Sequence, residues 1–208
     1  MRYLLPLTAL LLTPACATWE DPPPDGPAGL LEVVGPGEGA DLDGDGVPND
    51  YHWPRTALPV PVYLGDHLAG AWRQPVADAV AAIIAVSPGA VVLVDTPPPG
   101  PAVVVDGDGG SEPWHAKTTY TWAGDGALTA AYVQLPDNPQ GAPAYGPAAL
   151  HEVLHTLGLA HEAAPTSVLY PEARPTACWF RAATQALLQR VYGGTTTPAP
   201  IGAGGACR

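Results

Sequence analysis

Three histidines and one glutamate lie within eleven residues of the C-terminal half of the chain, in the sequence HEVLHTLGLAH. On an α-helix, His151 and His155 are four residues apart, so their side chains project from one face about one turn from each other. That spacing allows two imidazoles to bind one zinc ion. Gly158 is suited to end the helix in a left-handed conformation. The resulting turn would bring His161 back as a third ligand.

Three protein ligands leave the fourth coordination position open for water, which is typical of a catalytic zinc site. Glu152 follows the first ligand and can reach that water as a general base. Two histidines on a helix can also be polar residues of an exposed face. Here, however, five fixed positions coincide in a chain that has only six histidines. We therefore predict one zinc ion bound by His151, His155 and His161.

The complete pattern, H-E-x-x-H-x-x-G-x-x-H, resembles the signature of the metzincin clan of zinc peptidases. Ser167-Val168-Leu169-Tyr170-Pro171 lies where these enzymes have their Met-turn, which in the matrixin branch typically ends Met-Tyr-Pro. Leu169 replaces the methionine, and its similar volume would keep an apolar floor beneath the histidines. The terminal segment Val191-Tyr192-Gly193 also resembles the end of the last matrixin helix.

This resemblance implies an α+β fold with a mixed, mostly parallel five-stranded sheet, an N-terminal helix, a zinc-binding helix and a C-terminal helix. It also implies a zinc-dependent endopeptidase that hydrolyses peptide bonds through a zinc-activated water, with Glu152 as general base and no covalent intermediate. An edge strand at or beside Thr118–Trp122 would pair with an extended peptide substrate. The astacin tyrosine ligand is not carried over to Tyr170, because Pro171 occupies the corresponding place.

A second function class stays open, namely a catalytically inactive surface binding protein stabilised by zinc and calcium on a metzincin fold. The missing Met-turn methionine is the one feature that points to it. Glu152 favours the enzyme, because zinc binding alone does not require a general base.

The elements that must position the motif follow from the spacing of apolar residues and from the prolines and glycines between them. The helix at 72–86 carries apolar residues along one face, and Pro75 is compatible only with its first turn. Pro147 suits the start of the zinc-binding helix. We predict strands at 58–64, 90–94, 102–105, 118–122 and 128–135, and helices at 72–86, from about 147, and at about 176–192.

The composition indicates an exported acidic protein. Acidic residues outnumber basic residues by 20 to 8, which argues against a nucleic-acid partner. Residues 1–17 have the charged start, short apolar stretch and small-residue cleavage region of a signal peptide. Ala15-Cys16-Ala17 fits ordinary cleavage, whereas Leu12 to Cys16 resembles a bacterial lipobox, in which Cys16 becomes lipidated. We expect a monomeric cell-surface lipoprotein, or a secreted or periplasmic protein, that acts on peptides or proteins and contacts a membrane only through such an anchor.

A linker rich in proline, glycine and aspartate, residues 18–51, precedes the predicted catalytic domain, residues 52–208. Its alternating acidic residues resemble the calcium loops of EF-hands and thrombospondin type 3 repeats. The twelfth loop position is His52 instead of glutamate, and a solvated acidic loop is the alternative. The predicted calcium ligands are Asp41, Asp43, Asp45, Asn49 and Asp50.

Two further features predict less about function than the zinc motif does. Cys178 and Cys207 are the two cysteines that remain besides Cys16, and in an exported chain we expect them to form a disulfide bond. Asp106-Gly107-Asp108-Gly109 is a second, shorter acidic turn, which either binds a cation or is a plain loop.

Overall fold

The computed structural model describes residues 52–107, 116–123, 127–137, 145–159, 161, 167–170, 180 and 182–194. The predicted signal segment with Cys16, the linker with its proposed calcium ligands, and the pair Cys178 and Cys207 lie outside these residues. Those predictions therefore stay predictions.

The described residues form an α+β fold with three helices and a mixed five-stranded sheet that is mostly parallel. The elements are a 3-10 turn (Arg55–Ala57), β1 (Val60–Leu64), α1 (Gly70–Val86), β2 (Val91–Val94), β3 (Val103–Gly107), β4 (Lys117–Trp122), β5 (Leu128–Leu135), α2 (Tyr145–His155) and α3 (Ala182–Tyr192). The strand order is β2-β1-β3-β5-β4, and only β4 runs antiparallel to its neighbour. Within the described part of the chain, no helix has both the length and the apolarity needed to cross a membrane.

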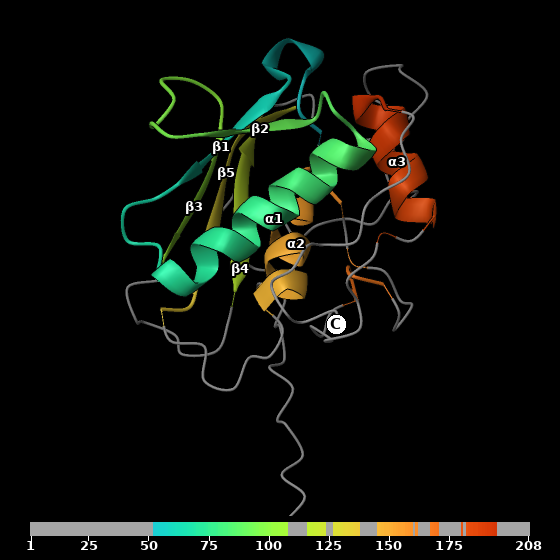
Figure 1. The fold of residues 1–208 in the computed structure, drawn as a ribbon. Coiled ribbons are helices and arrows are strands. Elements are labelled where there is room, and N and C mark those ends of the chain that lie inside the picture. Colours follow the sequence, from blue (N-terminus) through green and yellow to red (C-terminus); the bar gives the residue numbers. More distant parts are fainter. Residues whose placement is uncertain are drawn as a thin grey trace, which may run out of the picture.

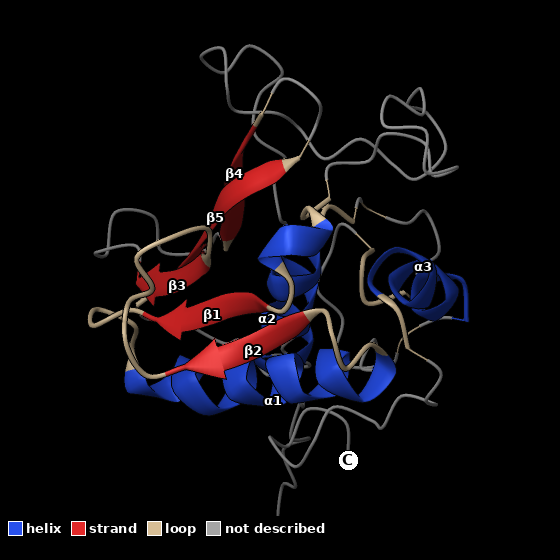
Figure 2. Cartoon of the chain, turned by 90° about the horizontal axis from the view of Figure 1, so that it is seen from above, coloured by secondary structure: helices blue, strands red, loops and turns tan. Residues whose placement is uncertain are grey.

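Helices α1 and α2 lie side by side on one face of the sheet, and α3 lies near the C-terminal end of α1 (Figures 1 and 2). Alternate residues of the inner strands point into this layer, because successive side chains of a strand point to opposite faces. Val60, Val62, Val103, Val105 and Val133 are all fully buried. Each such side chain stabilises the fold by about 1.5–3 kcal/mol relative to an exposed position.

Helix α2 is the most enclosed element. Every residue from 146 to 155 is buried, because α1 covers one side of the helix and the sheet another. The predicted start near Pro147 is close to the observed start at Tyr145. Pro147 lies in the first turn, where its missing N–H leaves no hydrogen bond unmade.

The five predicted strands and the helix predicted at 72–86 are confirmed to within two residues at each end, but the placement of Pro75 in the first turn and the start of the last helix were wrong. Helix α1 begins at Gly70, so Pro75 is its sixth residue and lies beyond the first turn. No side chain caps this end, so no capping residue marks the start of the helix at Gly70. The prediction that the last helix starts near Thr176 was also wrong, because Phe180 lies outside the helix. The apolar spacing that predicted the helix includes Phe180, although this residue is not helical.

A tryptophan fixes both ends of the connection from the sheet to α2. The Trp72 indole N–H donates a hydrogen bond to the Pro136 carbonyl, 2.8 Å away, just after β5. The same ring packs edge-on against Tyr145, the first residue of α2, with ring centroids 4.6 Å apart. Helix α1 therefore sets where α2 begins.

The other end of α2 is held by residues from both ends of the described chain. The Trp53 indole donates to the Thr156 carbonyl at 2.7 Å, and the Tyr192 hydroxyl donates to the Leu157 carbonyl at 2.8 Å. Tyr192 also accepts from the Trp53 main-chain N–H at 3.3 Å. These bonds satisfy the carbonyls of the turn that directly follows the helix and fix that turn to the rest of the domain.

Replacing Tyr192 by phenylalanine should lower the free energy of unfolding by about 1–3 kcal/mol, because the change leaves buried hydrogen-bonding groups unsatisfied. Urea unfolding measures this effect. Tyr63→Phe is the matched control, since its hydroxyl contacts Asp66 at an exposed position. That control should change stability by about 0.5 kcal/mol or less. Equal losses in both variants would contradict a specific role for the Tyr192 hydroxyl.

Candidate metal centre

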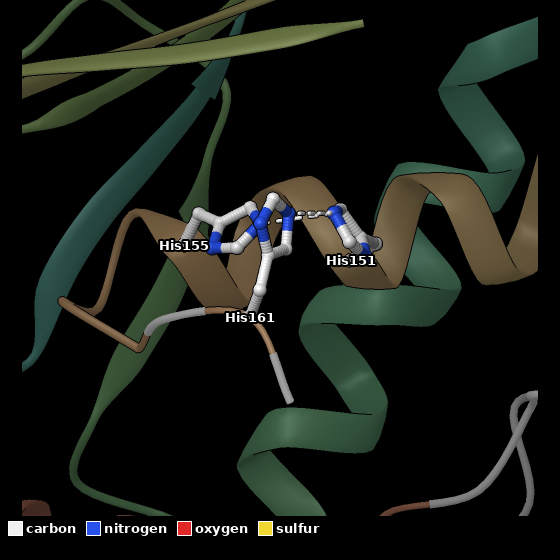
Figure 3. A group of neighbouring side chains, drawn as sticks. All are labelled: His151, His155 and His161. Carbon is white, nitrogen blue, oxygen red and sulfur yellow. Dashed lines mark hydrogen bonds between the residues drawn. The ribbon is translucent and has the colours of Figure 1, made fainter. Parts of the chain in front are cut away.

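The three motif histidines point toward one another (Figure 3). His151 and His155 come from successive turns of α2. Gly158 has φ of 81°, which confirms the predicted left-handed turn, and its N–H donates to the His155 carbonyl at 2.8 Å. The chain reverses there and returns His161 to the other two rings. All three ligand nitrogens lie within 4.8 Å of one another.

The spacing of the Nε2 atoms is close to what a metal ion needs. The Nε2 atoms of His155 and His151 are 2.9 Å apart, and those of His161 and His151 are 3.2 Å apart. Tetrahedral zinc with Zn–N bonds of about 2.0–2.1 Å places its nitrogen ligands roughly 3.3–3.4 Å apart. A small outward movement of the rings would therefore fit them to such an ion.

Main-chain carbonyls fix which nitrogen of two rings carries the hydrogen. Nδ1 of His151 lies 2.7 Å from the Val168 carbonyl, and Nδ1 of His155 lies 2.6 Å from the Leu159 carbonyl. A carbonyl only accepts hydrogen bonds, so each Nδ1 must donate. In a neutral ring, Nε2 is then left with a lone pair directed at the centre of the cluster.

Burial keeps these two imidazoles neutral. It lowers the pKa of His151 to about 4, against the opposing effect of the bond to Val168 and with a smaller lowering from His161. Burial also lowers the pKa of His155 well below its ordinary value, and the neighbouring His151 and His161 add to that shift. Neutral imidazole is the form that binds a metal. These three close histidines, two of them buried and one half-buried, could hold a metal ion.

Glu152 lies beside this cluster and is only 3% exposed. Its carboxylate oxygen Oε2 accepts a hydrogen bond from the Thr118 hydroxyl of β4 at 2.6 Å. The same hydroxyl lies 3.1 Å from the Glu152 main-chain carbonyl. Thr118 belongs to the strand predicted as the edge, but no spacing rule singled it out, because the contact joins residues 34 positions apart.

The segment 167–170 lies against His151, as expected for the turn that follows the motif. Leu169 is 1% exposed and belongs to the hydrophobic core. Its N–H donates to the Ser167 hydroxyl at 3.0 Å, and the Tyr170 N–H donates to the Ser167 carbonyl at 3.2 Å. This local turn presents the Val168 carbonyl to His151. The sequence could not predict this contact, because every residue has a main-chain carbonyl and the residue type does not show which one will bind a histidine.

Of the histidines outside the motif, the structure describes His52 and His67, and neither joins the cluster. His67 is exposed, and its Nδ1 lies 3.3 Å from Asp106 at the end of β3. His52 bridges to Ala127 through its main chain. In the ranges that the structure describes, His151, His155 and His161 are the one group of three residues close enough to share a metal ion. Asp108, Gly109 and His115 lie outside those ranges.

Comparison with protein-family models and with curated proteins finds no match to this chain.

Replacing one ring should weaken metal binding selectively. We expect His155→Ala to lower zinc affinity by at least the roughly 10–100-fold that loss of an outer hydrogen-bond partner typically costs. Competition titration against a chromophoric chelator measures the affinity, with one zinc expected per parent chain. His67→Ala is the control and should bind zinc like the parent. Equal affinity of both variants would show that the cluster is not the metal site.

Acid should destabilise the metal-free protein through the same rings. In the unfolded chain histidine binds a proton near pH 6.5, whereas folded His151 does so only near pH 4. The unfolded state therefore binds more protons below pH 6.5, and the free energy of unfolding falls as pH falls from 6.5 to 4. For His151 alone the loss is on the order of 3 kcal/mol.

Urea unfolding of chelator-treated protein across this pH range measures the effect. His151→Gln should show a shallower decline than the parent, and His67→Gln should follow the parent. An identical decline in all three proteins would contradict the assignment to His151.

Proposed function

We propose that the chain is an exported zinc-dependent endopeptidase of the metzincin type, nearest to the matrixin branch. The observation that carries the proposal is the convergence of three Nε2 atoms beside a buried glutamate. This arrangement joins a donor set for a metal with a group that can accept a proton. The mixed sheet, with α1 and α2 on one face, is compatible with such a domain.

Zinc is the metal we assign, because a set of three imidazole donors is typical of a zinc site that binds water as its fourth ligand. When bound, zinc lowers the pKa of a coordinated water and polarises the substrate carbonyl. Calcium at the linker aspartates, a lipid anchor at Cys16 and the Cys178–Cys207 disulfide are separate parts of this proposal.

Glu152 performs the proton transfers in this mechanism. Its carboxylate takes a proton from the attacking water as the new C–O bond forms. It then gives this proton to the leaving amine as the C–N bond breaks, so the glutamate ends in its starting state. Low exposure limits competition from bulk water for its oxygens.

Strand β4 supports an extended peptide as substrate. It is the antiparallel edge strand of the described sheet, and Thr118 joins it directly to Glu152. A peptide paired with the outer edge of β4 by main-chain hydrogen bonds would pass near the general base. The substrate class is therefore a peptide or an unfolded stretch of protein.

An inactive binding protein is the second candidate, and the observation that favours it is Leu169 in place of methionine. Leu169 is nevertheless fully packed, and the neighbouring Val168 carbonyl contacts His151. The apolar floor is thus filled without a sulfur atom, so we retain the enzyme as the proposal.

The decisive variant is Glu152→Gln, which keeps the shape of the side chain but cannot accept the proton. We expect it to retain one zinc per chain and to lose roughly 10²–10⁴-fold in kcat, the range typical of general-base catalysis. Cleavage of a diverse quenched-fluorescent peptide library, by parent and variant at matched zinc content, measures this loss.

Asp95→Asn is the control, because this exposed carboxylate follows β2 at the opposite edge of the sheet. It should cleave like the parent. Absence of cleavage by a zinc-loaded parent would favour the binding protein instead.

A further inference from the structure

We propose that Thr118 is a positioning residue that holds the Glu152 carboxylate in the orientation for proton transfer. The inference rests on the proposed function and adds a residue to it. Thr118 lies on β4, whereas Glu152 lies on α2, so the contact fixes the general base from a second element. The hydroxyl lies 2.6 Å from Oε2 of the carboxylate.

The geometry assigns the single hydroxyl hydrogen to the carboxylate. Oγ1 of Thr118 can donate once, and its two acceptors are Oε2 at 2.6 Å and the Glu152 main-chain carbonyl at 3.1 Å. The shorter contact falls in the range of hydrogen bonds to charged oxygens, which are stronger than neutral ones. The bond therefore engages Oε2 and fixes the orientation of the carboxylate group.

Fixing the glutamate matters because its side chain has three rotatable bonds. A free glutamate side chain loses rotamer entropy when it is fixed in one conformation. The hydrogen bond from Thr118 fixes the Glu152 side chain before substrate binds. Less side-chain entropy is therefore lost when the reaction takes place. Small displacements of catalytic groups can cost about 100-fold in rate, so a group that fixes the base is expected to act on kcat.

The neighbouring threonines of β4 use their hydroxyls differently, because alternate side chains of a strand point to opposite faces. Thr119 donates to the Tyr132 carbonyl of β5 at 3.4 Å. Thr121 shares a hydrogen bond with Thr129 of β5 at 2.9 Å. Thr118 is thus the threonine of β4 that contacts α2, and half-buried Thr119 is a matched control on the same strand.

The test compares Thr118→Val, Thr118→Ala, Thr118→Ser and Thr119→Val in the full mature chain, each with zinc content and melting temperature measured. We expect kcat of Thr118→Val and Thr118→Ala to fall roughly 10–100-fold, the usual effect of losing an outer hydrogen-bond partner, with KM changed less than about twofold. Thr118→Ser restores the hydroxyl and should recover most of kcat. Thr119→Val should retain the kcat of the parent.

Parental kcat in Thr118→Val and Thr118→Ala would overturn the role of Thr118, while inactive Glu152→Gln would leave the proposed function standing. A loss in Thr118→Ser or Thr119→Val as large as in Thr118→Val would also overturn it, because that pattern indicates damage to the packing of β4. A zinc-loaded parent that cleaves no peptide would overturn the proposed function, and the positioning role with it.

Discussion

The Nε2 atoms of His151 and His155 face each other at 2.9 Å, and their lone pairs repel one another unless a hydrogen-bond donor or a positive charge lies between them. The carbonyls of Val168 and Leu159 occupy Nδ1 of His151 and His155, so these rings cannot relieve the repulsion by exchanging the roles of their nitrogens. Protonation of either ring would also remove the repulsion, but burial opposes it by lowering the pKa of both histidines. A bound cation would satisfy these two lone pairs together with the His161 ring, and the free energy of binding it would add to the stability of the fold.

This constraint explains why α2 is held at both ends by distant parts of the chain. Trp72 of α1 contacts the residues that precede and begin the helix, while Trp53 and Tyr192 bind the carbonyls that follow it. Trp53 and Tyr192 are separated by 139 residues and contact each other. The histidine geometry therefore depends on the described domain as a whole. A local helix alone could not hold His151, His155 and the returning His161 within 4.8 Å of one another.

The parts of the site that the sequence predicted are those set by local geometry. The spacing of His151 and His155 places both on one face of a helix, and Gly158 supplies the turn that returns His161. The strands were also predictable, because runs of β-branched residues end at proline or glycine. The Val168 carbonyl and the Thr118 hydroxyl were not, since main-chain acceptors and long-range pairs leave no periodic signal. The start of α3 escaped prediction because apolar spacing does not mark a helix end.

The buried carboxylate gives the strongest reason to prefer an enzyme over a binding protein. Enclosing an ionised group at 3% exposure costs free energy unless hydrogen bonds and charges compensate it. A site that only bound zinc would need the three histidines and their carbonyl partners, and an apolar residue at position 152 would stabilise it at least as well. Replacement of methionine by Leu169 carries less weight, because the contact to His151 is made by the main chain of Val168 and the apolar volume is kept. An oriented carboxylate is what the proposed proton transfer requires, whereas the described contacts that orient His151 and His155 are made by main-chain carbonyls and need no sulfur atom.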